Sequence, residues 1–260
     1  LSQEILKRVR RIFNCPNGLR GCNIDLPVAS VGATENIMIA ASTAKGITTL
    51  RNAAKEPEIT DLANFLRSCG AKIKGDGETV IQIEGVDRLY GCNHTVIPDR
   101  IVAATYIGAV AVCGGNVTIK NACPSHLHAV IPCFEQLGCN IDCKKNEITI
   151  TSDKNLTGNI RVQTTEYPGF PTDAGPIIIS MLALAKGTSV FVENIFENRF
   201  RYVDELKRLG AKITTEGRSA IIEGTERLLG ASCKCTDLRG GAALVVAGLS
   251  AKGTTVINEI

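Results

Sequence analysis

Cysteine and histidine are the residues of this sequence whose chemistry first invites attention. The chain holds eleven cysteines and three histidines. Structural zinc sites repeat close ligand pairs of the C-x-x-C type. The close pairs here, Cys139/Cys143 and Cys233/Cys235, begin no such repeat, and several other cysteines lie in apolar helical runs where a thiol packs as a small hydrophobe. We therefore expect no metal, and free reduced thiols in a cytoplasmic protein.

Five polar residues that could do chemistry also have plain structural readings. Asp173 precedes a long apolar helix, where an aspartate commonly caps the first turn. Asp237 reads as a turn residue before another helix, Arg199 and Arg239 as surface ion-pair partners, and Ser30 as part of a turn and cap. Standard Gly-rich phosphate loops and the Gly-x-Ser-x-Gly and His-Glu-x-x-His motifs are absent from the sequence. Local patterns alone therefore leave the function open.

Composition narrows the class of protein. The chain of 260 residues is 44% apolar and 21% charged, and its aromatic content is 4% without tryptophan. Its core must therefore be aliphatic. A formal charge of +3 argues against a nucleic-acid partner. No apolar run reaches the ~18 residues of a membrane span, so we expect no membrane partner, although residues 1–12 could form a basic surface helix or one that lies on a membrane.

An internal repeat organises the chain. An apolar helix, a glycine, a β-branched run and an asparagine recur, with the glycines spaced by 69, 72 and 66 residues: Gly46, Gly115, Gly187 and Gly253. A second pattern, a helix that ends in glycine before a strand, recurs at Gly70, Gly138 and Gly210. Both patterns indicate a unit of about 70 residues.

Each unit is expected to contain helix, strand, helix, strand and strand. The helices at residues 37–41 and 177–184 are apolar nearly all round, which indicates burial. Each following glycine is expected to provide the left-handed cap that ends a helix. The β-branched runs 48–50, 117–119 and 190–192 then predict strands. We expect the helices to be buried on one another, with the sheets facing outward.

Six short strings, in a fixed order, carry a family resemblance. They are Ser30-Val-Gly-Ala-Thr-Glu-Asn, Glu56-Pro-Glu-Ile with Asn64-Phe-Leu, Pro98-Asp-Arg, Pro168-Gly-Phe-Pro-Thr-Asp, Glu197-Asn-Arg-Phe and Thr236-Asp-Leu-Arg. Together they resemble the UDP-N-acetylglucosamine 1-carboxyvinyltransferases, over roughly residues 18–260.

That resemblance implies an inside-out α/β barrel (enolpyruvyl transferase-like) of two domains, built of such repeats and with its N-terminal portion missing. Residues 1–97 would be part of the first domain and residues 98–260 most of the second, with substrates held in the cleft between them. The implied reaction moves the enolpyruvyl group of phosphoenolpyruvate to the 3-hydroxyl of UDP-N-acetylglucosamine, without metal or cofactor. This is the first committed step of peptidoglycan synthesis, and it links the protein to cell wall biogenesis, cell shape and cell division in the cytoplasm.

The resemblance also assigns roles to single residues. Asp173 matches the carboxylate proposed as general base for the sugar hydroxyl. Arg199 and Arg239 match cationic positions near the anionic substrates, and Asp237 matches a further active-site carboxylate. The list of expected nucleotide-sugar contacts is Ser30, Val31 and Gly32 at the diphosphate, and Ile195 in the pocket wall.

Departures from the family pattern leave alternatives open. The region with the phosphoenolpyruvate-binding lysine and the proton-donor loop has no match here, and neither Cys15 nor Cys22 takes the place of the catalytic cysteine. The chain is therefore expected to be a piece of an active enzyme, inactive alone. The alternatives are a catalytically silent homologue that binds a nucleotide sugar or a protein partner, and an enolpyruvyl transferase of the shikimate type.

Overall fold

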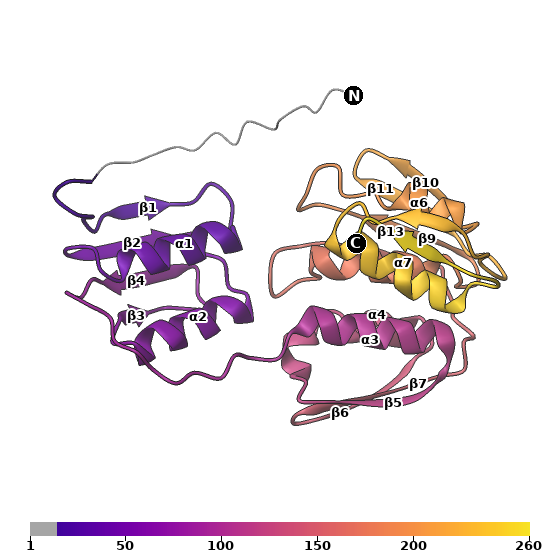
Figure 1. Cartoon of the computed structure of the whole chain (residues 1–260), viewed down its shortest axis with the longest axis horizontal. Helices are drawn as coiled ribbons and strands as arrows, with labels where there is room; N and C mark the ends of the chain where they lie inside the picture. The colour runs from indigo at the N-terminus through magenta and orange to yellow at the C-terminus, as the bar shows by residue number, and fades with distance from the viewer. Residues whose placement is uncertain (1–14) are drawn as a thin grey trace. The chain divides into compact units, whose positions relative to one another are not determined.

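The computed structural model describes residues 15–260, which divide into two compact units (Figure 1). The first unit ends at Thr95 and the second runs from Val96 to Ile260. The domain boundary expected after residue 97 lies two residues beyond this division. The expected basic helix at residues 1–12 falls outside the described residues.

The first unit holds one four-stranded sheet and two helices. Its elements are β1 (Asn23–Asp25), α1 (Val31–Ala41), β2 (Ile47–Arg51), α2 (Pro57–Ser68), β3 (Lys72–Lys74) and β4 (Val80–Glu84). The strand order is β1-β2-β4-β3, with β1 parallel to β2 and the other pairs antiparallel. Gly46 and Gly70 adopt φ of +95° and +101°, values that glycine tolerates best, at the turns that follow the two helices.

The second unit continues the repeat with three more sheets. The first group is α3 (Arg100–Cys113), β5 (Gly115–Lys120), the 3-10 helix η1 (Pro124–Leu127), α4 (Ile131–Gln136), β6 (Asn140–Lys144) and β7 (Glu147–Ser152). The second is β8 (Arg161–Gln163), the 3-10 helix η2 (Thr172–Ala174), α5 (Gly175–Leu182), β9 (Thr188–Val192), α6 (Val203–Arg208), β10 (Lys212–Glu216) and β11 (Ser219–Glu223). The last is β12 (Ser232–Lys234), α7 (Leu238–Ser250) and β13 (Val256–Asn258). The strand orders are β5-β7-β6, β10-β11-β9-β8 and β12-β13.

The expected five-element unit lacks one strand that the structure shows. A short strand precedes the first helix in three of the repeats (β1, β8 and β12), and each pairs in parallel with the strand after that helix. Each has three residues and one apolar side chain between two polar ones. Such strands carry no β-branched run, so the sequence pattern could not reveal them.

Three apolar helices form the centre of the second unit. Helices α3, α5 and α7 contact one another, and every residue of α5 is buried. The approach of α3 to α5 is close, because a Cβ added at Gly108 would lie 2.4 Å from Cγ2 of Ile177. The Ser180 hydroxyl lies 3.0 Å from the Ala243 carbonyl oxygen and so links α5 to α7. The strands β9 and β11 alternate buried and less buried residues, as expected of sheets with one face outward.

In the second unit these helices therefore lie inside and the sheets outside, which confirms the predicted inside-out α/β architecture. The predicted burial of residues 37–41 in α1 is wrong, because only Met38 and Ala41 of this stretch are buried and Ile39 is 53% exposed. In the part of the chain that is described, no helix is long and apolar enough to cross a membrane.

All eleven cysteines lie within the described residues, and none forms a disulfide. Burial, the larger cause in each case, raises the pKa of Cys133 to about 12 and that of Cys139 to about 11. Both thiols are therefore protonated at neutral pH. Among residues 15–260, no cluster of three His, Cys, Asp or Glu residues could hold a metal ion.

We expect Gly108→Val to lower the free energy of unfolding of the second unit by about 2 kcal/mol, because overpacked cores typically lose 1–3 kcal/mol. The new side chain would collide with Ile177, so adding Ile177→Ala should recover part of the loss. Chemical denaturation followed by circular dichroism measures both effects. Val102→Ala, at an exposed position of α3, is the control. A Gly108→Val protein as stable as this control would contradict the close helix contact.

The thiols should differ in reactivity according to burial. At pH 7.5 we expect a maleimide to label the exposed Cys22 and to leave Cys133 and Cys139 unlabelled, because the raised pKa values keep both buried thiols protonated. Peptide mass spectrometry of the labelled protein reads this out, with guanidinium-unfolded protein as the fully labelled reference. Labelling of Cys133 as fast as that of Cys22 would be inconsistent with the described core.

Candidate active site

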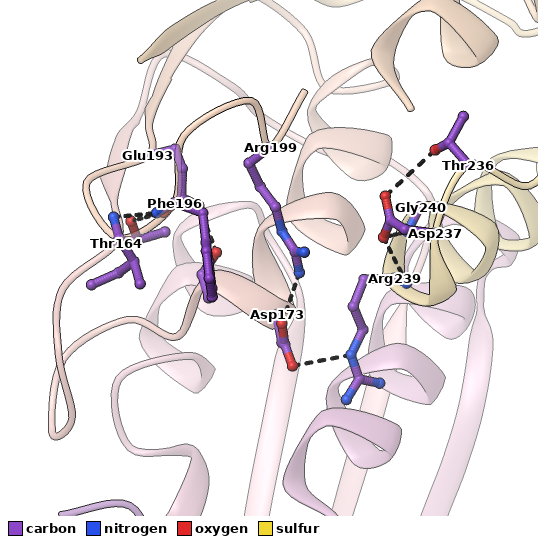
Figure 2. A network of polar contacts seen from close by, with 11 residues as sticks. Thr164, Asp173, Glu193, Phe196, Arg199, Thr236, Asp237, Arg239 and Gly240 are labelled. Atoms are coloured by element: carbon purple, nitrogen blue, oxygen red, sulfur yellow. Dashed lines mark hydrogen bonds and ion pairs between the residues drawn. The ribbon is translucent and has the colours of Figure 1, made fainter. Parts of the chain in front are cut away.

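Asp173 lies at the centre of a charged cluster that opens to solvent. It belongs to η2, directly before the buried helix α5. Its Oδ1 accepts a hydrogen bond from Nη2 of Arg199 at 2.7 Å, and its Oδ2 accepts one from Nε of Arg239 at 3.2 Å (Figure 2). The side chain of Asp173 remains 39% exposed. A carboxylate offers about four lone-pair positions, so this one can still accept a hydrogen bond from a ligand.

The repeat shows that Asp173 is not an ordinary helix cap. The first helices of the other repeats, α1, α3 and α7, begin after Ser30, Asp99 and Asp237, and each of these side chains caps its helix. In the repeat that holds Asp173 the residue at the equivalent N-cap position is Pro171, and no side chain makes a cap hydrogen bond at η2 or at α5. The capping role that the sequence allows for Asp173 is therefore wrong, and its carboxylate faces the two arginines instead.

The two arginines keep hydrogen-bond donors that the carboxylate does not use. The guanidinium of Arg199 lies 5.5 Å from the ring centre of Phe196, and its Nε is buried with no hydrogen-bond partner among the described residues. Arg239 is the second residue of α7 and meets Asp173 through Nε. Guanidinium N–H groups grip carboxylates and phosphates in two-point fashion, so the pair could hold an anion beside Asp173.

Asp237 acts as the cap of the helix that carries Arg239. Its Oδ1 accepts hydrogen bonds from the N–H groups of Arg239 and Gly240 at 3.0 and 2.9 Å. Its Oδ2 lies 3.4 Å from the hydroxyl of Thr236, and in Figure 2 no dashed line joins this side chain to Asp173. The structural reading of Asp237 is thus observed, and its predicted catalytic role stays a prediction.

Glu193 is a member of the cluster that the sequence analysis did not select. It is 1% exposed and follows β9 directly. Its Oε1 accepts from the Thr164 hydroxyl at 2.8 Å and from the N–H groups of Ile195 and Phe196 at 2.8 and 3.1 Å. Its Oε2 accepts from the Thr172 hydroxyl at 2.7 Å. The sequence feature that could have pointed to Glu193 is a single carboxylate directly after the apolar run Val190–Val192.

The predicted pocket residue Ile195 lies in the loop between β9 and α6, with 38% of its surface exposed. Tyr202, seven residues further along the chain, is buried, and burial raises the pKa of its hydroxyl, with an opposing contribution from Arg199. Tyr202 therefore stays neutral.

Beside η2, Gly175 leaves room for Phe191, whose Cζ would lie 2.6 Å from an added Cβ. A larger residue at position 175 would displace that ring.

Ser30, Val31 and Gly32 lie in the first unit, at the start of α1. The Oγ of Ser30 caps the helix by accepting from the Ala33 N–H at 3.3 Å. A Cβ added at Gly32 would meet nothing within 4 Å, so the space over the first turn is open. Free N–H groups and the positive end of the helix dipole make such a turn suitable for an anion.

Comparison with known proteins places the chain among enolpyruvyl transferases. The UDP-N-acetylglucosamine 1-carboxyvinyltransferase 2 of Clostridium acetobutylicum is 52% identical over 242 residues, which are 93% of this chain and 58% of that protein. The enzyme of the same name from Bacillus cereus is 50% identical over 260 residues, which are 100% of this chain and 60% of that protein. The chain thus spans about three fifths of the length of these relatives.

Solved structures agree. The enolpyruvyl transferase NikO from Streptomyces tendae has a TM-score of 0.82 at 25% identity, over 93% of this chain and 60% of that one. An EPSP synthase from Acinetobacter baumannii has a TM-score of 0.66 at 22% identity, over 93% and 59% of the two chains, which supports the fold alone.

The family described as EPSP synthase (3-phosphoshikimate 1-carboxyvinyltransferase) matches residues 8–260. The predicted resemblance and the predicted fold are both confirmed. The chain belongs to the EPSP synthase (3-phosphoshikimate 1-carboxyvinyltransferase) family of enolpyruvyl transferases.

Proposed function

We propose that this chain serves the transfer of the enolpyruvyl group from phosphoenolpyruvate to the 3-hydroxyl of UDP-N-acetylglucosamine. Relatives about half identical to it carry the name of that reaction. The observation that carries the proposal is that Asp173 faces two arginines while its side chain stays partly exposed. The pathway would be peptidoglycan synthesis in the cytoplasm, and so cell wall biogenesis, cell shape and cell division.

Asp173 would accept the proton of the sugar hydroxyl. A hydroxyl is a weak nucleophile until a positioned base takes its proton. Its oxygen then bonds to the phosphate-bearing carbon of phosphoenolpyruvate, and the methylene carbon gains a proton. Loss of phosphate, together with a proton from the new methyl group, restores the double bond. The sum is alcohol plus phosphoenolpyruvate to enol ether plus phosphate.

Arg199 and Arg239 would hold the anionic parts of the reactants beside that carboxylate. Preorganised cations stabilise charge that develops in a transition state without reorganising at the moment of reaction. Asp237 would belong to the site by fixing the first turn of α7, which carries Arg239.

Ser30, Val31 and Gly32 would bind the diphosphate of the nucleotide at the start of α1, and Ile195 would line the sugar pocket. We further propose that the two compact units correspond to the two barrel domains of the family. The shikimate-type alternative has weaker support, because the matched EPSP synthase structure is 22% identical whereas the uridine-sugar relatives reach 52%.

Asp173→Ala should weaken the binding of UDP-N-acetylglucosamine about tenfold to a hundredfold, since a hydrogen bond to a charged group contributes about 1.5–3 kcal/mol. Isothermal titration calorimetry of the chain with the nucleotide sugar measures the dissociation constant. Asp204→Ala removes an exposed carboxylate of α6 and is the matched control. Equal affinity of the two variants would remove Asp173 from the proposed site.

Gly32→Asp should separate binding from stability at the start of α1. A carboxylate in the first turn suits the helix dipole and should keep or raise the free energy of unfolding, by about 0.3–1 kcal/mol. The same charge should repel the diphosphate and weaken nucleotide-sugar binding by about tenfold at low salt. Gly32→Ala is the control, because its Cβ meets nothing within 4 Å. Should both variants bind alike, the diphosphate does not lie at this turn.

A further inference from the structure

We propose that Glu193 is a positioning residue that fixes the relative positions of Asp173 and Arg199. It does so through two sets of hydrogen bonds, called arms below, one to the loop before Arg199 and one to the turn that carries Asp173. The inference deepens the proposed function, because it concerns the same site. The carboxylate touches neither Asp173 nor Arg199 by any hydrogen bond that the structure shows. It instead binds residues that precede each of them in the chain.

The first arm holds the loop that carries Arg199. The N–H groups of Ile195 and Phe196 donate to Oε1 of Glu193. The guanidinium carbon of Arg199 in turn lies over the ring of Phe196, 5.5 Å from the centre of that ring. The position of one carboxylate oxygen therefore fixes the backbone and the ring on which Arg199 rests.

The second arm holds the turn that carries Asp173. The hydroxyl of Thr172, the residue before Asp173, donates to Oε2 of Glu193 at 2.7 Å. Because η2 is uncapped by any side chain, this bond anchors the turn from the side. The two oxygens of one buried carboxylate thus connect the two partners of the ion pair.

The repeat shows that the fold itself does not require a carboxylate at this position. Asn194 binds the Thr164 carbonyl through Nδ2 at 3.0 Å, and Asn52 of the first repeat makes the same kind of contact with the Leu26 carbonyl at 3.0 Å. That asparagine contact is therefore part of the architecture. The strand register makes Asn52 and Asn121, which directly follow β2 and β5, the equivalents of Glu193, and both are exposed. The buried carboxylate of Glu193 is therefore a difference from the other repeats, and it occurs in the repeat that holds Asp173.

Burial of a charge at this position has a cost that hydrogen bonds must offset. A buried carboxylate is expensive unless donors satisfy it. Three donors converge on Oε1 and one on Oε2, so the charge is satisfied where it lies. Removal of the carboxylate would leave two loop N–H groups and two threonine hydroxyls to find new partners, and both arms would shift.

The test compares Glu193→Ala and Glu193→Gln with Lys120→Ala, a control at an exposed charged residue that ends β5 in the preceding repeat. Hydrogen–deuterium exchange of the full chain reports the backbone of residues 172–174 and 195–199, and calorimetry reports UDP-N-acetylglucosamine binding. We expect Glu193→Ala to speed exchange in both segments and to weaken binding about tenfold or more. Glu193→Gln keeps one acceptor oxygen and should show a smaller loss on both counts. Lys120→Ala should change neither.

Thr172→Val tests one arm alone and covers the case in which Glu193→Ala fails to fold. It removes the hydroxyl but keeps the side-chain shape, so exchange should rise at residues 172–174 while residues 195–196 stay protected. In an Asp173→Ala background, Glu193→Ala should have little further effect on binding, because a positioning residue acts through the group that it positions.

Unchanged exchange at both segments in Glu193→Ala, or unchanged exchange at residues 172–174 in Thr172→Val, would overturn the proposal. Full additivity of Glu193→Ala with Asp173→Ala would also overturn it, by reducing Glu193 to general stability. If the unaltered chain does not bind the nucleotide sugar, the proposed function fails, and the exchange data still decide whether Glu193 positions the pair.

Discussion

The burial of α3, α5 and α7 on one another is the constraint on which the second unit depends. Because every residue of α5 is buried, that helix has little freedom to shift. Gly108 permits the close approach to Ile177, and Ser180 ties α5 to α7 by a hydrogen bond. Asp173 lies in η2, two residues before α5 begins, and Arg239 lies in the first turn of α7. Helix packing therefore sets the distance between these two charged groups before any ligand arrives.

Most of this architecture could be predicted from the sequence, because its signals are local and repeated. The strands predicted at residues 48–50, 117–119 and 190–192 lie within β2, β5 and β9. The glycines that mark the repeat, such as Gly187 at φ +107°, adopt the predicted positive φ. Their predicted role as helix caps is wrong at α1 and α5, because Ser42 and Ala183 end these helices and Gly46 and Gly187 lie four residues later. The parallel strands β1, β8 and β12 could not be found. Their three residues are strands because a neighbour supplies hydrogen bonds, and no local preference records that neighbour.

The site was predictable where a motif marks it and obscure where tertiary contacts define it. Asp173, Arg199 and Arg239 were selected from family strings, and the structure brings all three together. Ser30–Gly32 belong to the other compact unit. Asp237 had two readings that its local sequence could not separate, and the hydrogen bonds to Arg239 and Gly240 show a cap. Glu193 was missed because its partners, Thr164 and Thr172, are distant in sequence, so no spacing rule connects them.

Comparison of equivalent positions in the repeats also separates residues that the fold requires from residues that serve the site. A residue that performs the same task in several repeats, such as the capping Ser30, Asp99 and Asp237, has a role in the fold whatever else it does. A residue that departs from its equivalents at some cost in stability needs another reason to be there. In the repeat that holds Asp173 the N-cap position is Pro171, so this repeat lacks the side-chain cap that typically contributes about 1 kcal/mol. Glu193 buries a charge where its equivalents are exposed. Both departures fall in one repeat and are linked through Thr172, so they are best understood as parts of a single site.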